Sequence, residues 1–237
     1  MTTDRTDAPF IIVGGGMAGD AAARGIRMVE EDHPIVLLTT EGSGPYDRPP
    51  LSKDPLASDL AERVDRQTSS EGVDVRTRAR VRRIDRKGRR VVLQDGEALE
   101  WRGLVLAPGA RPVVPAWARV PDGAEDLEVL AFRTLEDARA LAGRVEEGCV
   151  PLVVGGGFVG TELAAALAKS GHAPALAYPE DAPLGRVLPD PFPRLMARYL
   201  EGLGVELQPG TAFRSTETLA SSAPEAAPRR GGAPGGV

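Results

Sequence analysis

Two glycine-rich turns hold the residues whose spacing is best suited to chemistry. In the first turn, Gly14, Gly16 and Gly19 follow the apolar run 10–13 at GxGxxG spacing, which predicts a buried strand leading into a helix. The first glycine permits a tight turn, the second lets the backbone approach a pyrophosphate, and the third lets the helix pack against the strand. A phosphate group would meet unpaired amides at the positive end of the helix dipole. The same spacing also occurs in turns that bind nothing, so the flanking segments must decide.

The segments after the first turn favour a dinucleotide site. Apolar residues recur at helical spacing from Ala18 to Val29, and the run 35–38 predicts a second buried strand. Glu41 follows Gly19 by about 20 residues, where an acidic side chain can accept both hydroxyls of an adenosine ribose. These features predict a strand–helix–strand unit that binds a dinucleotide.

The second turn repeats the first. Gly155, Gly157 and Gly160 follow the apolar run 151–154, and an amphipathic helical pattern continues through Ala168. Two such folds predict a dinucleotide in each half of the chain. One chain with two such sites suggests that electrons pass between them.

The composition restricts the class of protein. With 237 residues, 42% of them hydrophobic, the chain can form one large domain or two ordinary ones. A net charge of −5 and an isoelectric point near 5.3 argue against nucleic acid as a partner. No apolar run is long enough to span a membrane, and the polar start, residues 1–9, lacks a signal-peptide core, so we expect a cytoplasmic protein with no membrane partner.

Cys149 is the only cysteine, which excludes a disulfide or a redox-active cysteine pair within the chain. Electrons must therefore pass from cofactor to cofactor and then to an external acceptor. Cys149 lies at the start of an apolar strand and is predicted to be a small buried hydrophobic residue. His33 and His172 each lie in a polar turn before a strand and are predicted to be surface residues rather than catalytic acids or bases.

The segment 45–54, PYDRPPLSKD, is the most distinctive part of the sequence. Its prolines stiffen a loop that leads into a short helix, and Arg48 and Lys53 lie on this constrained segment. Lysine occurs at only three positions, so arginine accounts for the other 26 of the 29 basic residues. Lys53 thus suggests a need for a compact ammonium group with an adjustable pKa, which argues against the alternative that the segment is only a solvated turn.

The order of motifs along the chain gives a family resemblance. The chain resembles the two-dinucleotide flavoprotein oxidoreductases of the ferredoxin reductase and apoptosis-inducing factor type over about residues 10–213, and the run 178–189 is most similar to the second branch. The motifs that carry the resemblance are, in order, GGGMAG, PYDRPPLSK, APGARP, RTLEDARAL and GGGFVGTELA. The resemblance implies an α/β fold with two Rossmann-like dinucleotide-binding domains, both incomplete on the C-terminal side. It also implies FAD in the first half and NADH or NADPH in the second.

The resemblance further implies a set of site residues. The FAD pyrophosphate would be held by Gly14, Gly16, Met17, Ala18 and Gly19, its adenosine end by Thr40 and Glu41, its phosphate and flavin sides by Arg48 and Lys53, and its adenine by the backbone of Val81. The nicotinamide cofactor would contact Gly156, Gly157, Phe158, Val159 and Glu162, with Glu180 and Arg186 at its adenosine end. Lys53 would lie beside the flavin ring and pair with Glu162, whose place near a helix N-terminus would favour its charge. Lys53 would then stabilise negative charge on the reduced ring.

Two features bear on cofactor binding. The family usually has Thr at the position of Pro108 and Arg at that of Val113, and both departures fall near the expected flavin phosphates, where they would weaken FAD binding. In the second half, Glu180 would favour NAD, whereas Arg186 would accommodate a 2′-phosphate. The resemblance favours NADH.

The remaining patterns complete the predicted elements. Strands are predicted at 81–85, 90–93, 104–107, 150–154, 173–178 and 205–208, and helices from the N-cap Thr134 to Glu146 and at 192–203. Asp137 takes the place of the Glu or Gln of a full capping box. The Arg-rich stretch 76–90 could be a nucleic-acid patch, but its alternating apolar residues favour a strand face with solvated arginines.

The predicted domains are an FAD-binding part at 9–112, an incomplete NAD(P)H-binding domain at 113–213 and a disordered tail at 214–237. Three functions remain open. The first is hydride transfer from NAD(P)H to FAD and on to an acceptor such as a ferredoxin or a small quinone-like molecule. The second is an inactive nucleotide-binding remnant. The third is a subunit whose missing half is supplied by a second chain.

Overall fold

The computed structural model describes residues 7–118, 129–211 and 213. The chain divides into two compact units, Met1–Val113 with Leu130–Ala212, and Val114–Val129 with Phe213–Val237. In the second unit, Trp117 of the short 3-10 helix η2 (Ala116–Ala118) stacks on Phe213 with 5.2 Å between ring centroids. The other described elements belong to the first unit. The predicted disordered tail, 214–237, lies outside the described residues.

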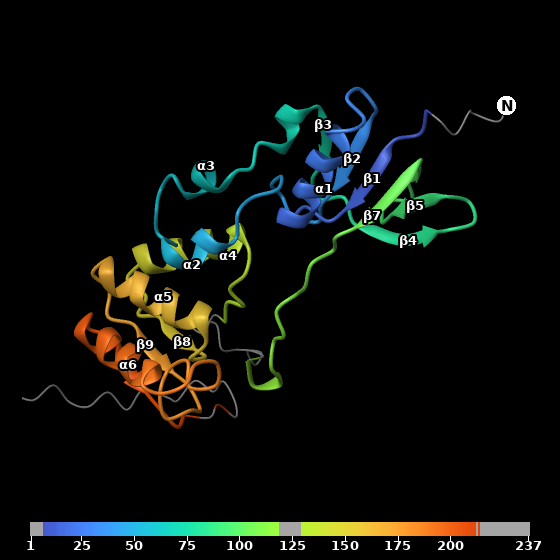
Figure 1. Cartoon of the computed structure of the whole chain (residues 1–237). Helices are drawn as coiled ribbons and strands as arrows, with labels where there is room; N and C mark the ends of the chain where they lie inside the picture. The colour runs from blue at the N-terminus through green and yellow to red at the C-terminus, as the bar shows by residue number, and fades with distance from the viewer. Residues whose placement is uncertain (1–6, 119–128, 212, 214–237) are drawn as a thin grey trace, which may run out of the picture. The chain divides into compact units, whose positions relative to one another are not determined.

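A parallel four-stranded sheet forms around the first glycine-rich turn (Figure 1). Its strand order is β3-β2-β1-β7, with β1 at Phe10–Val13, β2 at Ile35–Leu38, β3 at Val73–Arg76 and β7 at Gly103–Leu106. Helix α1, Met17–Arg27, connects β1 to β2 as the crossover that a parallel pair requires. The predicted strands 10–13 and 35–38 are confirmed, and the strand predicted at 104–107 begins and ends one residue earlier.

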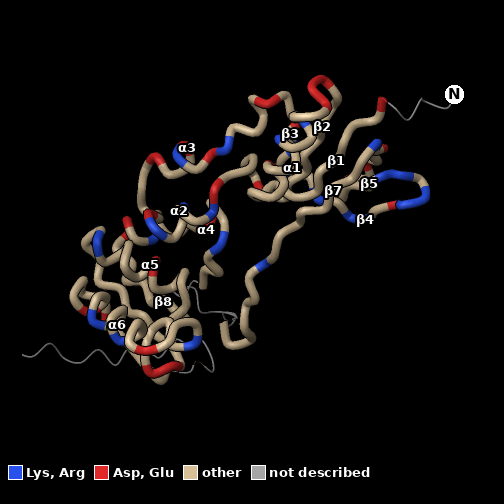
Figure 2. The backbone as a smooth tube through the Cα atoms, in the orientation of Figure 1, with Lys and Arg blue, Asp and Glu red and all other residues tan. Residues whose placement is uncertain are grey.

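A three-stranded antiparallel sheet follows in the chain, formed by β4 (Val81–Asp85), β5 (Arg90–Leu93) and β6 (Ala98–Glu100). Basic residues gather along β4, β5 and the turn between them (Figure 2). Two of the arginines of the stretch 76–90 pair with neighbouring carboxylates, Arg76 with Asp74 and Glu97, and Arg90 with Asp85. Apart from Arg76, every arginine of this stretch is exposed, and β4 lies within it. The predicted strand face with solvated arginines is therefore confirmed.

A parallel three-stranded sheet of order β10-β9-β8 forms around the second glycine-rich turn. The strands are β8 (Leu152–Val154), β9 (Ala175–Ala177) and β10 (Glu206–Gln208), connected by α5 (Phe158–Lys169) and α6 (Phe192–Gly202). Each strand is shorter than predicted. Pro151 and Pro174 have no N–H to donate, so β8 begins directly after the first and β9 directly after the second, and the amide of Val205 donates to Leu200 instead of to the sheet. The predicted pair of Rossmann-like α/β folds is confirmed.

Three short helical segments lie between β2 and β3 in the sequence, and a fourth short segment and one longer helix lie between β7 and β8. These segments carry part of the predicted site. They are α2 (Pro49–Lys53), α3 (Leu60–Val64), the 3-10 helix η1 (Thr68–Glu71), η2 and α4 (Leu135–Glu146). Buried residues of α2, α3 and α4, including Leu51, Leu60 and Ala138, form one apolar cluster with Tyr46. Helix α2 also contacts α5. The motif helix therefore packs against elements of both halves.

The N-terminus of α4 forms a complete capping box. Thr134 Oγ1 accepts a hydrogen bond from the amide of Asp137 at 3.1 Å, and the Asp137 carboxylate accepts one from the amide of Thr134 at 2.7 Å. An Asp therefore serves here in place of the usual Glu or Gln.

The prediction that Cys149 is buried is wrong. Its thiol is exposed because the helix α4 ends at Glu146 and the strand β8 begins only at Leu152, which leaves Cys149 in the connecting turn. His33 and His172 are half-buried, and His33 Nε2 lies 2.8 Å from the carbonyl oxygen of Ala8. None of the helices in the described ranges is both long and apolar enough to cross a membrane.

The capping box yields a stability prediction. Thr134→Ala should lower the free energy of unfolding by about 1 kcal/mol, because the amide of Asp137 loses its acceptor at the helix start. Urea unfolding followed by circular dichroism measures the change. Thr134→Ser keeps the hydroxyl and should remain within about 0.5 kcal/mol of the wild type; an equal loss in both variants would contradict the capping role.

Candidate functional site

The two glycine-rich turns have the same backbone geometry. Each follows a parallel strand, β1 or β8, and leads into a helix, α1 or α5. Gly14 and Gly155 adopt φ values of +124° and +117°, which residues with a Cβ atom rarely adopt. A ligand at these turns would lie beyond the carboxyl ends of the strands, where open α/β sheets bind their ligands.

The third glycine of each turn is required by the fold itself. A Cβ atom at Gly19 would lie 2.0 Å from the carbonyl oxygen of Gly14, and one at Gly160 would lie 1.9 Å from that of Gly155. Both distances are far below a van der Waals contact. Gly156 also has a packing role, since its Cβ would lie 2.9 Å from the ring of Tyr178. The structure thus places Gly156, a predicted cofactor contact, against the protein interior.

The second glycine of each turn is different. Gly16 and Gly157 have ordinary extended backbone, and a Cβ atom at either position would meet nothing within 4 Å. Neither is needed for the turn or for packing. Both are the N-cap residues of their helices, and neither helix has a side-chain hydrogen bond at its cap. Each position therefore leaves room for an anionic group to approach the first helical amides, which fits a dinucleotide pyrophosphate.

The two residues that follow each second glycine are the first residues of the helices, and their side chains are exposed to solvent. Met17 and Ala18 of α1 and Phe158 and Val159 of α5 are exposed. All four were predicted to contact cofactors. Their exposure leaves the first turn of both helices accessible to a ligand.

The structure brings Lys53 and Glu162 together, as predicted. Lys53 Nζ of α2 lies 2.9 Å from Glu162 Oε1 of α5. The other carboxylate oxygen, Oε2, accepts a hydrogen bond from Ser52 Oγ at 2.6 Å. Ser52 is buried and was missed as a site residue, because its role depends on a partner 110 positions later in the chain.

These contacts control the ionisation of Glu162. Burial raises the pKa of its carboxyl, but the hydrogen bonds from Ser52 and Lys53 and the charge of Lys53 outweigh burial, so the pKa lies below its ordinary value. Glu162 is the fifth residue of α5 and lies beyond the first turn, where the helix dipole acts most strongly. The donors from α2, rather than the predicted dipole, therefore stabilise its charge.

Glu41 and Arg48, predicted at different parts of the FAD site, bind each other. Arg48 Nη2 lies 2.5 Å from Glu41 Oε1, and Glu41 Oε2 accepts a hydrogen bond from Tyr46 Oη. Tyr46 Oη also accepts bonds from Arg48 and from the amide of Leu135, both at 3.0 Å. Burial and the Glu41 hydrogen bond raise the pKa of Tyr46, so it remains a donor. Tyr46 was not predicted, although it lies within the motif.

The other two residues predicted near the adenosine end of FAD, Thr40 and Val81, do not belong to the cluster of Glu41, Tyr46 and Arg48. Thr40 is exposed and Val81 is half-buried at the start of β4. The neighbouring Thr39 is buried, and its hydroxyl accepts a hydrogen bond from the amide of Glu41 at 3.2 Å. Within the described ranges, Ser43 Oγ alone is a buried side-chain polar atom without a partner. A ligand at this end could satisfy it.

In the second half, Glu180 and Arg186 form a loose ion pair at 3.5 Å. The two residues that would favour opposite cofactors therefore offset each other. Their loop is tied to the second turn by a 2.7 Å hydrogen bond from the amide of Leu184 to the carbonyl of Gly156. This bond places the pair beside the turn.

The two residues that depart from the family pattern lie on the surface, in the segment after β7. Pro108 and Val113 are both exposed, and the Pro108 nitrogen would lie 3.1 Å from a Cβ atom at Gly14. Pro108 therefore borders the first turn. No cluster of His, Cys, Asp or Glu side chains suited to a metal ion occurs in the described part of the chain.

The family model for pyridine nucleotide-disulphide oxidoreductases matches residues 8–225. The chain belongs to this family. Among curated relatives, the ferredoxin–NAD(+) reductase component of the anthranilate 1,2-dioxygenase system of Burkholderia cepacia is 36% identical over 90% of this chain and 52% of that protein. Human apoptosis-inducing factor 3 is 36% identical over 81% of the chain and 31% of that protein. The predicted family resemblance is confirmed.

Solved structures agree. Putidaredoxin reductase, in its covalent complex with putidaredoxin, matches with a TM-score of 0.76 and 29% identity, over 90% of this chain and 52% of that one. The ferredoxin reductase of the CYP199A2 system from Rhodopseudomonas palustris matches with a TM-score of 0.78 and 27% identity over the same shares. This member of the oxidoreductase family spans about half the length of these relatives or less.

The contact between Ser52 and Glu162 yields a pH prediction. Ser52→Ala should raise the pKa of Glu162, because the ionised carboxylate loses a donor. In the wild type, the stabilisation from ionised Glu162 is complete above 4.5, the ordinary pKa, and is lost as the pH falls through the lower folded pKa. In the variant the loss begins at the same pH, but the stabilisation should be smaller and should be fully lost at a higher pH than in the wild type.

Carbon-13 NMR titration of labelled glutamate carboxyls, assigned with Glu162→Gln, measures this pKa directly. Ser70→Ala is the matched control, since Ser70 Oγ is exposed and donates only to the Gln67 carbonyl oxygen. An unchanged Glu162 pKa in Ser52→Ala would rule out the assigned hydrogen bond.

Proposed function

We propose that the chain binds FAD at the first glycine-rich turn and NADH at the second, and that it forms the nucleotide-binding part of an oxidoreductase that passes electrons to an external carrier. The observation that carries this proposal is the room left at Gly16 and Gly157, where the fold needs no glycine. The names of the relatives, which include ferredoxin and rubredoxin reductases acting with NAD(+), support the reaction class.

The bound cofactors would supply the chemistry, which is transfer of a hydride from the nicotinamide to the flavin. The chain's residues would bind and orient them. Gly16 admits the FAD pyrophosphate to the first helical amides of α1, in the turn that Gly14 and Gly19 form, and Gly157 does the same at α5. Glu41 retains lone pairs for ribose hydroxyls beside its bonds to Tyr46 and Arg48.

Lys53 would place one positive charge at the flavin ring. Glu162 accepts a hydrogen bond from Lys53 Nζ at one oxygen, which fixes the position of the ammonium group. Ser52 holds the other oxygen and orients the carboxylate. Because Lys53 is more than half exposed, its charge is screened by water, and we expect a moderate effect on rate.

The choice of NADH rests on Glu180 and on the NAD(+) in the relatives' names. Glu180 is less exposed than Arg186, with 22% against 81% of the side chain accessible. We therefore expect Glu180 to accept a ribose 2′-hydroxyl, and the more exposed Arg186 to leave the ion pair when the cofactor binds. The electron acceptor would be a ferredoxin or a small quinone-like molecule.

A second candidate is that the chain binds nucleotides but needs another polypeptide for turnover. It is favoured by β8, which lies at the edge of its sheet and carries exposed Leu152 and Val154. Exposed apolar side chains on an edge strand are suited to covering by further chain. Co-purification of a second polypeptide would favour this candidate over the first.

The glycine geometry yields a paired prediction. Gly16→Ala should fold with nearly wild-type stability but weaken FAD binding by about tenfold or more, because the methyl group occupies the space of the pyrophosphate. Gly19→Ala should instead lower the free energy of unfolding by about 1–3 kcal/mol through its clash with Gly14. Flavin fluorescence and urea unfolding separate the two effects. Unchanged FAD affinity in Gly16→Ala would place the cofactor elsewhere.

Electron transfer is tested by anaerobic titration of the flavin-reconstituted protein with NADH. Bleaching of the flavin absorbance is expected for the wild type. Lys53→Met should slow the reduction by about tenfold, less than the loss of a buried donor would cause. Lys87→Met, which removes an exposed lysine in the turn between β4 and β5, is the control and should leave the rate unchanged. Equal rates in all three proteins would remove Lys53 from the mechanism.

A further inference from the structure

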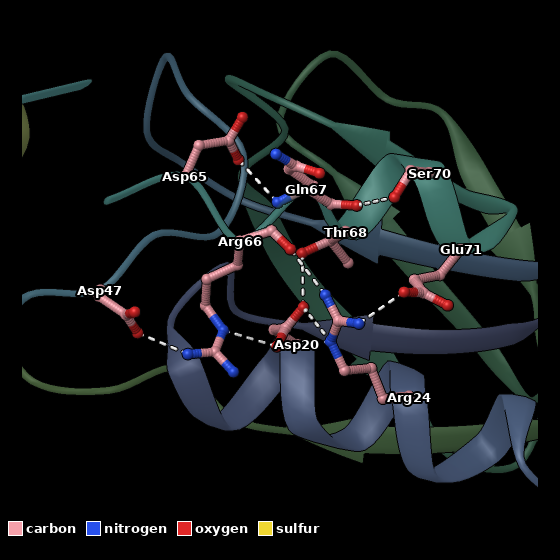
Figure 3. A network of polar contacts seen from close by, with 9 residues as sticks. All are labelled: Asp20, Arg24, Asp47, Asp65, Arg66, Gln67, Thr68, Ser70 and Glu71. Carbon is pink, nitrogen blue, oxygen red and sulfur yellow. Dashed lines mark hydrogen bonds and ion pairs between the residues drawn. The ribbon is translucent and has the colours of Figure 1, made fainter. Parts of the chain in front are cut away.

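Asp20, the residue after the last glycine of the first turn, is a buried carboxylate with three donors. Its side chain has no exposed surface. Arg66 Nε lies 2.6 Å from Oδ2, Thr68 Oγ1 lies 2.6 Å from Oδ1, and Arg24 Nε lies 3.1 Å from Oδ2 (Figure 3). A buried charge is tolerated only when it is paired and hydrogen-bonded in this way. Because an apolar residue could stabilise the fold as well, the network needs an explanation other than stability.

Arg66 connects Asp20 to the motif segment 45–54. Its Nη1 lies 2.5 Å from Asp47 Oδ1, while its Nε holds Asp20. The backbone makes the same connection. The amide of Arg66 donates to the carbonyl of Pro45 at 3.1 Å, and the amide of Asp47 donates to that of Val64 at 2.8 Å. Residue 66 is therefore bound to the motif segment by both its backbone and its side chain.

Arg24 strengthens the link from the helix side. Its Nη2 donates to the carbonyl oxygen of Arg66 at 2.6 Å, and its Nη1 lies 2.6 Å from Glu71 (Figure 3). Two side chains of α1, Asp20 and Arg24, thus hold residue 66 at its guanidinium group and at its carbonyl. The helix that begins at the first glycine-rich turn is connected in this way to the segment that carries Arg48 and Lys53.

We propose that Asp20 and Arg66 are positioning residues for the FAD site, which fix the motif segment through Asp47 relative to the glycine-rich turn of α1. The inference rests on the proposed FAD binding. Arg48 and Lys53 would reach the cofactor from one segment while the pyrophosphate binds at α1, so the distance between these two elements sets the fit of the site. A rigid two-ended arginine suits this role, since its planar fork can hold two carboxylates at once.

The charge of Asp20 is consistent with this arrangement. Burial raises the pKa of its carboxyl, but the hydrogen bonds from Thr68, Arg66 and Arg24 outweigh burial, and the pKa lies below its usual range. The group is ionised at neutral pH. An unpaired negative charge in this part of α1 would repel an anionic cofactor, and the two guanidinium groups offset it.

The test compares two carboxylates at opposite ends of the network. Asp47→Ala removes the contact from Arg66 to the motif segment, whereas Glu71→Ala removes a similarly exposed acid, 41% against 44%, that contacts Arg24 and does not reach the motif. Both variants leave Asp20 with all its donors and should fold. Amide hydrogen exchange of the cofactor-free proteins, and FAD affinity from fluorescence quenching, are measured for each.

We expect Asp47→Ala to speed exchange of the amides of Asp47 and Leu51 and to weaken FAD binding by about fivefold, and Glu71→Ala to change neither. Arg66→Met should speed amide exchange and weaken FAD binding more than Asp47→Ala does. Arg66→Lys should restore only part of the wild-type protection and affinity, since an ammonium group lacks the planar fork. If Arg66→Met fails to fold, the comparison of Asp47→Ala with Glu71→Ala remains decisive.

Unchanged exchange at the motif amides in Asp47→Ala, or equal effects of Asp47→Ala and Glu71→Ala, would overturn the positioning role while wild-type FAD binding stands. A wild-type chain that binds no FAD would overturn the proposed function and, with it, this inference. The two failures are distinguished because hydrogen exchange needs no cofactor.

Discussion

In both halves of the protein, the first turn of a helix packs so closely on the glycine that follows the preceding strand that only another glycine fits at the contact. A Cβ atom at Gly19 or Gly160 would lie about 2 Å from the carbonyl oxygen of the first glycine in the same turn. The helix therefore cannot be displaced from the end of the strand without losing this packing. Its first amides remain open beside the second glycine, and the acidic and basic side chains of the site are arranged around that fixed point.

Glu162 connects the two halves. It lies just beyond the first turn of α5, and its two oxygens are held by Ser52 and Lys53 of the motif helix α2. The contact is polar and partly exposed, so its net contribution to stability is small. Its value is geometric. A carboxylate fixed at both oxygens leaves the Lys53 ammonium group one preferred position, and that position relates the first nucleotide fold to the second.

The sequence predicted features that depend on local pattern. Both glycine-rich turns, three of the four strands of the first sheet and the capping box at Thr134 follow from residue spacing and hydrogen-bonding rules within a few positions. The family resemblance added the pair of Lys53 and Glu162. Ser52, Tyr46 and the Asp20 network were not predicted, because each depends on a partner that only the tertiary fold brings close. Cys149 was wrongly placed because the predicted strand began too early.

The strong bias toward arginine acquires a meaning in this network. Arg66 joins two carboxylates, Arg24 joins two carboxylates and a carbonyl, and Arg48 joins Glu41, Tyr46 and a carbonyl. Each uses the several fixed donors of a guanidinium group to bridge segments that are distant in sequence. Lys53 instead makes its single short contact with one carboxylate oxygen. An arginine at position 53 would add donors and favour further bridges, whereas a lysine leaves a compact charge available to a ligand.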